Sequence, residues 1–139
     1  MSSIKETAAL FFDACETGKG WETCKTFCHP NASFSAQSDT FKEVQTIEAY
    51  TESMKGLITG PIPDASYELR SLAVDEERGN VSGYAVFKGS HSGEGGPAAP
   101  TGKTVETDFV YVMKFDGDRI SHMTKIWNDG DAMRQLGWG

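Results

Sequence analysis

The sequence predicts an α+β fold in which helices cover one face of a curved antiparallel sheet. Up to about residue 58, apolar residues recur at the three- and four-residue spacing of amphipathic helices. From residue 64 onward the spacing changes to two, the period of strands that bury one face. Helices followed by a run of strands are typical of α+β folds. The 139 residues contain no repeat and no long linker, so we expect one domain over 1–139.

Three helices are predicted in the first part of the chain. The first begins at the capping box Ser3-Ile-Lys-Glu6, in which the Ser3 hydroxyl accepts from the Glu6 amide, and it ends at the glycines of 18–20. Its apolar stripe consists of Ile4, Ala8, Phe11, Phe12 and Cys15. A second, short helix ends before Pro30, and its apolar side carries Trp21, Cys24, Phe27 and Cys28. A third is expected over about 45–58, with a stripe of Ile47, Tyr50, Met54, Leu57 and Ile58.

Four strands are predicted in the second part, at 67–74, 81–91, 105–115 and 119 to about 127. Asp116-Gly117 forms a tight turn between the last two, and the Gly/Pro-rich segment 92–102 is expected to be a loop. One face of the second strand carries Val81, Gly83, Ala85, Phe87, Gly89 and His91. One face of the third carries Val105, Thr107, Phe109, Tyr111, Met113 and Phe115.

Composition narrows the range of partners. A net charge of −7 with scattered basic residues argues against nucleic acid and anionic membranes, which need clustered Lys and Arg. No run approaches the ~20 apolar residues of a membrane span. The start of the sequence lacks the features of an export signal, so we expect a cytoplasmic protein with reduced cysteines. Cys24, Cys28 and His29 have no second ligand pair at a usual spacing, so no metal site is predicted.

Four short pieces in the last third of the chain resemble one known family. They are Gly89-Ser-His-Ser-Gly93, Pro100-Thr-Gly-Lys103, the Asp116-Gly117 hairpin and Gln135-Leu-Gly137 in a short amphipathic helix. In this order they resemble the SnoaL-like polyketide cyclases, a branch of the nuclear transport factor 2-like superfamily. The resemblance implies a cone-shaped fold, with a curved antiparallel sheet and about three helices packed on its concave face. It also implies a deep apolar pocket, a homodimer, and a first short strand entered through 27–34.

His91 is the first candidate for chemistry. It follows Ala85 and Phe87 on the apolar face of its strand, where a polar side chain needs a partner or a cavity. Its imidazole can transfer protons near neutral pH. The resemblance places it at the family's histidine that faces the substrate. The alternative is a core histidine bonded to a neighbouring carbonyl.

Lys125 is the second candidate, because the last strand departs from the family pattern. The cyclases carry a His-Trp-Asp triplet there, whose aspartate is the general acid/base of an aldol step. Counting without gaps places Met123-Thr-Lys125 at the triplet, and a shifted frame places Asn128 at the aspartate. Either alignment leaves this strand without the family's carboxylate, so we expect no aldol cyclisation of the family's polyketide esters.

A lysine in an apolar pocket supports two kinds of chemistry. Loss of hydration lowers the pKa of Lys125, so that the amine can act as a base or a Schiff-base nucleophile. Its ammonium can equally hold an acidic group of a substrate. The alternative is a lysine that extends its charge to water or pairs with Asp129 or another carboxylate. Further residues expected to line the pocket are Tyr50, Met54, Tyr111, Met123, Trp127 and Asn128.

These observations predict binding of a small, mostly apolar molecule with a carbonyl or carboxylate group. Acid/base turnover of the isomerase, cyclase or hydratase type would need no cofactor. The alternative is a non-catalytic ligand-binding or dimerisation module, since one fold hosts many functions. A homodimer is expected through the outer face of the sheet, which carries Tyr84, Val86, Val110 and Val112.

Overall fold

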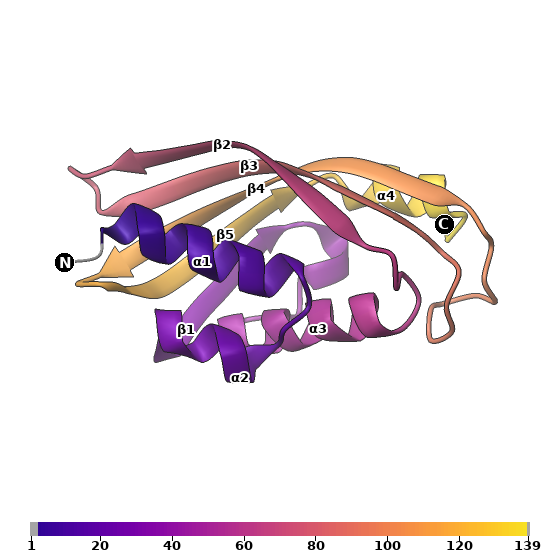
Figure 1. Ribbon diagram of the computed structural model, residues 1–139, viewed down its shortest axis with the longest axis horizontal. Coiled ribbons are helices and arrows are strands. Elements are labelled where there is room, and N and C mark those ends of the chain that lie inside the picture. The colour runs from indigo at the N-terminus through magenta and orange to yellow at the C-terminus, as the bar shows by residue number, and fades with distance from the viewer. Residues whose placement is uncertain (1–2, 139) are drawn as a thin grey trace.

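A computed structural model describes residues 3–138 of the chain. Over these residues the helical elements are α1 (Ile4–Glu16), α2 (Trp21–Cys24), η1 (Lys25–Phe27), η2 (Asp39–Phe41), α3 (Ile47–Thr59) and α4 (Asp129–Leu136). The strands are β1 (Cys28–Gln37), β2 (Ser66–Asp75), β3 (Asn80–Ser90), β4 (Thr104–Asp116) and β5 (Arg119–Trp127). The sheet arches over α1, α2 and α3, which lie together on its concave side (Figure 1). The predicted α+β class is confirmed, because helices pack on one face of a five-stranded sheet.

The strand order is β1-β5-β4-β3-β2. Strands β2 to β5 pair antiparallel, as predicted, whereas β1 runs parallel to β5. A tight hairpin forces an antiparallel pair, but β1 is not joined to β5 by a hairpin and can pair in either direction. The sheet is therefore mixed, with one parallel edge strand that is longer than the short strand expected.

Helix α1 begins at the predicted cap, because the Ser3 hydroxyl accepts a hydrogen bond of 3.2 Å from the Glu6 amide. Its inner face buries Phe11 and Phe12 against the sheet. The Phe12 ring lies so close to Gly83 of β3 that a Cβ atom there would approach it to 2.9 Å. Because Gly83 has no side chain, α1 can pack directly against the backbone of β3. This packing places the C-terminal end of α1 over the inner face of the sheet.

Helix α4 lies beside the end of β4 that extends beyond its pairing with β5. The Gln135 side chain accepts from the Glu106 backbone amide at 2.7 Å and donates to the Glu106 carbonyl at 3.1 Å. It thereby satisfies backbone groups of β4 that no longer have a strand partner. Gly137 ends the helix with a φ of 74°, a left-handed conformation that favours glycine. Helix α4 thus closes one end of the space between the sheet and α3.

Within residues 3–138, no helix has both the length and the apolar character required to cross a membrane.

Candidate functional site

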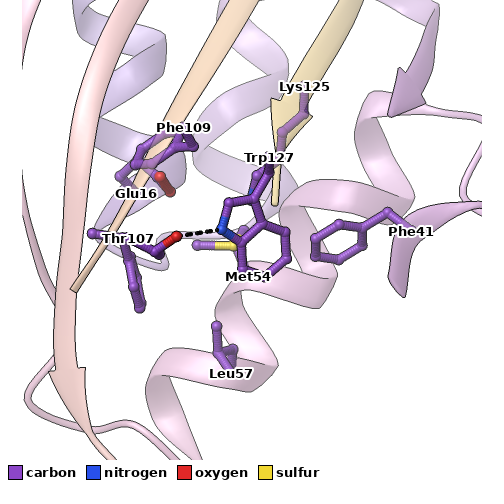
Figure 2. Close-up of a pocket in the computed structure, with 9 residues that line it drawn as sticks. Glu16, Phe41, Met54, Leu57, Thr107, Phe109, Lys125 and Trp127 are labelled. Carbon is purple, nitrogen blue, oxygen red and sulfur yellow. Dashed lines mark hydrogen bonds between the residues drawn. The ribbon is translucent and has the colours of Figure 1, made fainter. Parts of the chain in front are cut away.

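An apolar pocket lies between the inner face of the sheet, α3, η2 and α4. Its outer part has a volume of about 150 Å³, and a smaller inner chamber has about 30 Å³. The two parts are adjacent, because they share the wall residues Phe41, Met54, Leu57, Phe87, Thr107 and Trp127. Figure 2 shows Phe41 on one side of the Trp127 indole, with Met54 and Leu57 below it. Glu16 and Lys125 line only the inner chamber, so the two ionisable groups lie at one end of a mostly apolar space.

Lys125 points into the inner chamber because it shares the inner face of β5 with Met123, while Ile126 faces outward. The residue is only 5% exposed. Its Nζ donates a hydrogen bond of 2.9 Å to the Tyr50 hydroxyl. Five aromatic rings surround Nζ at 4.3–5.9 Å from their centroids, and they belong to Phe41, Tyr50, Phe109, Tyr111 and Trp127. Ring faces attract the ammonium and replace part of its lost hydration.

Glu16, the last residue of α1, places a carboxylate at the same chamber. It is 1% exposed, and neither carboxylate oxygen has a hydrogen-bond partner among the described residues. Burial raises the pKa of Glu16 to about 7, although the nearby Lys125 charge opposes this shift. Burial likewise lowers the pKa of Lys125 to about 8, against the attraction of Glu16. Both groups can therefore gain or lose a proton near neutral pH.

Glu16 is not among the site residues that the sequence predicts. A signal existed, because Glu16 follows Phe12 by four residues and so lies on the buried stripe of α1. A carboxylate in the last turn of a helix is nevertheless normally exposed. Phe41 and Thr107, which also line the pocket, were not singled out as site residues either.

Two phenols lie between the ionisable groups of the chamber, Glu16 and Lys125, and the core. The Tyr50 hydroxyl is hydrogen-bonded to the Tyr111 hydroxyl, and Tyr111 also contacts the Cys15 thiol at 3.9 Å. Because Lys125 donates to Tyr50, the proton of Tyr50 is free to be donated to Tyr111. Burial raises the pKa of both phenols well above the ordinary value. They therefore remain protonated and orient the Lys125 amine.

Hydrogen bonds fix the rim of the pocket. The Trp127 indole donates to the Thr107 hydroxyl at 3.0 Å, which sets the ring across the pocket (Figure 2). The Thr40 amide donates to the Asp129 carboxylate at 2.7 Å, so that η2 is tied to the start of α4. This contact holds Phe41 in the pocket wall, where it lines both parts.

His91 lies outside the pocket wall. It is fully buried, and its Nδ1 accepts from the Thr101 amide at 3.2 Å and from the Trp138 indole at 2.8 Å. Two donors on Nδ1 place the proton of the neutral ring on Nε2, which has no hydrogen-bond partner among the described residues. His91 thus ties the 92–102 loop to the C-terminal segment, and a catalytic role for it stays a prediction.

The remaining predicted site residues fall into two groups. Met54 and Trp127 line both parts of the pocket, and Tyr50 and Tyr111 lie behind Lys125. Met123 is fully buried in the core and lines neither part. Asn128 is exposed and accepts the Asp131 amide at 3.2 Å as the cap of α4. Their predicted roles in substrate binding stay untested.

Residues 3–138 contain no group of three or more His, Cys, Asp or Glu side chains placed to hold a metal ion.

Comparisons with known proteins confirm the predicted nuclear transport factor 2-like fold. The sequence profile of the SnoaL-like polyketide cyclases matches residues 6–136, and the chain belongs to this family. None of the curated proteins compared with it gives a significant match.

Several solved structures share the fold. IdmH from Streptomyces antibioticus, described as a candidate polyketide cyclase, superposes with a TM-score of 0.78 at 19% identity, over 98% of this chain and 99% of that one. A candidate polyketide cyclase from Acidithiobacillus ferrooxidans gives 0.77 at 22% identity, over 99% and 96%. AclR from Streptomyces galilaeus, described as a candidate hydroxylase, gives 0.72 at 20% identity, over 99% and 88%. At these identities the likeness concerns the fold alone.

Proposed function

We propose that the protein binds a small, mostly apolar molecule and exchanges protons with it at a carbonyl or carboxylate group held by Lys125. One observation carries this proposal. Glu16 and Lys125 are both buried and both line the inner chamber of an otherwise apolar pocket. The reaction class would be isomerisation, cyclisation or hydration, each of which needs only positioned acids and bases.

The size of the pocket indicates the size of the ligand. A cavity of about 150 Å³ accepts a molecule with a single ring. Its walls are aromatic and aliphatic, so the ring would lie against Trp127, Phe87 and Leu57. The inner chamber of about 30 Å³ has room for a single polar group beside Lys125.

Lys125 and Glu16 can have separate roles in proton transfer, one as the acid and the other as the base. The Lys125 ammonium would donate to a carbonyl oxygen, and the Glu16 carboxylate would accept a proton from the adjacent carbon. Both interactions are strengthened by the exclusion of water from the chamber. A pKa of about 7 suits Glu16 to give back the proton after accepting it.

Matched ligands test the binding half of this proposal. Lys125→Met should weaken benzoate about tenfold to hundredfold more than benzamide, because it removes a charge-assisted hydrogen bond. Lys114→Met, on the exposed face of β4, is the matched control and should change neither affinity. Titration calorimetry measures both. Equal losses for the two ligands would contradict the role given to Lys125.

Deuterium exchange tests the proton-transfer half. Acetophenone in deuterated water should lose its methyl protons faster with the wild-type protein than with Glu16→Gln, by about a hundredfold. Nuclear magnetic resonance follows this loss directly. Binding without any exchange would instead support a non-catalytic ligand-binding module.

We also propose a homodimer through the outer face of the sheet. Ile126 of β5 is 48% exposed there. Val110 and Val112 lie on the same face of the neighbouring strand β4, with Val110 directly opposite Ile126, and both are partly buried. An isologous contact would cover this apolar surface.

A further inference from the structure

We propose that Lys125 forms a covalent imine with an aldehyde or ketone that enters the pocket, which makes this protein a carbonyl-binding enzyme of the Schiff-base type. The proposal rests on the proposed function, because it uses the same pocket, and it adds a bond between the ligand and Nζ. It follows from where the amine lies, what surrounds it and which acid stands beside it.

The Lys125 amine is placed for attack on a carbonyl carbon. Strand β5 fixes its backbone, and the hydrogen bond to Tyr50 is the only one that Nζ makes among the described residues. A neutral amine that donates one proton to Tyr50 keeps its lone pair free. Lys125 lines the inner chamber, which adjoins the larger cavity along the shared wall. A ligand with its ring in the outer cavity would extend its polar group past this wall toward Nζ.

Burial supplies the neutral amine that this reaction needs. An ammonium has no lone pair, and at an exposed site it predominates at neutral pH. Burial lowers the pKa of Lys125 to about 8, so that a useful fraction of the amine is neutral. The charged and titratable groups that face it are Glu16 and Cys15 of α1, Asp129 at the start of α4, and the phenols of Tyr50 and Tyr111. Of these, Glu16 is the acid that shares its chamber.

The reaction balances with this chain's own groups. Nζ attacks the carbonyl carbon, a proton moves from nitrogen to oxygen, and a carbinolamine forms. The protonated Glu16 carboxyl gives its proton to the hydroxyl group, which leaves as water, while the nitrogen lone pair forms the C=N bond. The products are an iminium on Lys125, a Glu16 carboxylate and one water molecule. Hydrolysis reverses the same steps, and no oxidant or reductant takes part.

The surroundings favour the iminium over the free reactants. It is a cation, and Trp127, Phe41 and Tyr50 present ring faces within 5.1 Å of its nitrogen. The Glu16 carboxylate that remains lines the same chamber as a counter-ion, and it has no hydrogen-bond partner among the described residues. Apolar walls also limit the water that hydrolyses imines in solution. These features distinguish Lys125 from the exposed lysines, which have none of them.

Reductive trapping tests the proposal. The wild-type protein is incubated with benzaldehyde and sodium cyanoborohydride, which reduces iminium ions, and is then analysed by mass spectrometry with peptide mapping. We expect one benzyl group on Lys125, formed at least tenfold faster than on any exposed lysine. Lys125→Arg, which keeps the charge but cannot form the imine, should lose this adduct, whereas Lys114→Met should keep it. Adduct formation on Lys125 no faster than on exposed lysines would overturn the proposal.

Two further measurements separate this proposal from the proposed function. The trapping rate should be bell-shaped in pH with a maximum between about 7 and 8, because it needs a neutral amine and a protonated Glu16. Glu16→Gln should lower the rate about a hundredfold at the maximum and remove the alkaline decline. Benzoate binding with no trapped adduct would refute the imine and leave the proposed function standing. Absence of both would refute both.

Discussion

Replacing the buried pair by apolar residues should stabilise the protein most near pH 7.5. The change is Glu16→Leu together with Lys125→Met, which approximately conserves side-chain volume. Apolar replacement of a buried ion pair is often neutral or stabilising by about 1–4 kcal/mol, because removing two charges from water is costly. The structure also predicts how this gain depends on pH.

Each group makes its own contribution to the pH dependence. The pKa of Glu16 is raised by folding, from 4.5 to about 7, so its stabilising contribution is complete below 4.5 and is lost as pH rises to about 7. The pKa of Lys125 is lowered, from 10.5 to about 8, so its contribution is complete above 10.5 and is lost as pH falls to about 8. Each difference corresponds to about 3 kcal/mol. The wild-type protein should therefore have a minimum of stability between pH 7 and 8 relative to the double variant.

Urea unfolding measured from pH 5 to 10 is the assay. The variant's advantage in free energy of unfolding should grow by about 2 kcal/mol from pH 5 to 7.5 and shrink by a similar amount toward pH 10. The control replaces the exposed pair Lys88 and Glu106, whose charged atoms lie 3.6 Å apart, by Met and Gln. It should change stability by less than about 1 kcal/mol at every pH. An advantage of the double variant that does not change with pH would refute the reasoning.

Two other predictions concern parts of the molecule outside the pocket. Sedimentation should give twice the monomer mass for the wild-type protein and the monomer mass for Val112→Asp, because a carboxylate would be buried in the sheet-face contact; a wild-type monomer at micromolar concentration would contradict the dimer. His91→Phe should lower the free energy of unfolding by about 1–3 kcal/mol, because the buried amide of Thr101 and indole of Trp138 lose their acceptor. Benzoate affinity should not change in this variant, and a large loss would show that His91 contacts the ligand.

The succession of elements could be predicted from the sequence because local signals specify it. The capping box at Ser3 sets the start of α1, and the two-residue period sets β2 to β5 with their faces. The parallel pairing of β1 depends on a contact with β5 that no local pattern encodes. The short helix predicted around Gln135-Leu-Gly137 begins earlier, at Asp129, where the Asn128 side chain caps it by accepting from the Asp131 amide.

The site was predictable only in part, for a similar reason. Lys125 lies on the inner face with Met123, which the alternation of β5 allows but does not require, because either face of a strand can be the buried one. Glu16 reaches the same chamber from an element more than a hundred residues earlier in the chain. Phe41 belongs to a short 3₁₀ turn, whose single turn has no period to detect. These residues meet only because distant elements pack together in the folded protein. The sequence pattern of each single element does not predict which other elements it will contact.

Stability alone does not explain why this chain carries Glu16 and Lys125 in its interior. Folding gains little from the pair, because the carboxylate oxygens make no hydrogen bond among residues 3–138 and both pKa values are shifted against the charged forms. Leu and Met would fill the same volume beside the same aromatic rings without that cost. Glu16 lines a chamber large enough for one polar group and adjacent to a ring-sized cavity. This arrangement supports the proposed function, in which the polar end of a ligand would supply the hydrogen bonds that the protein does not.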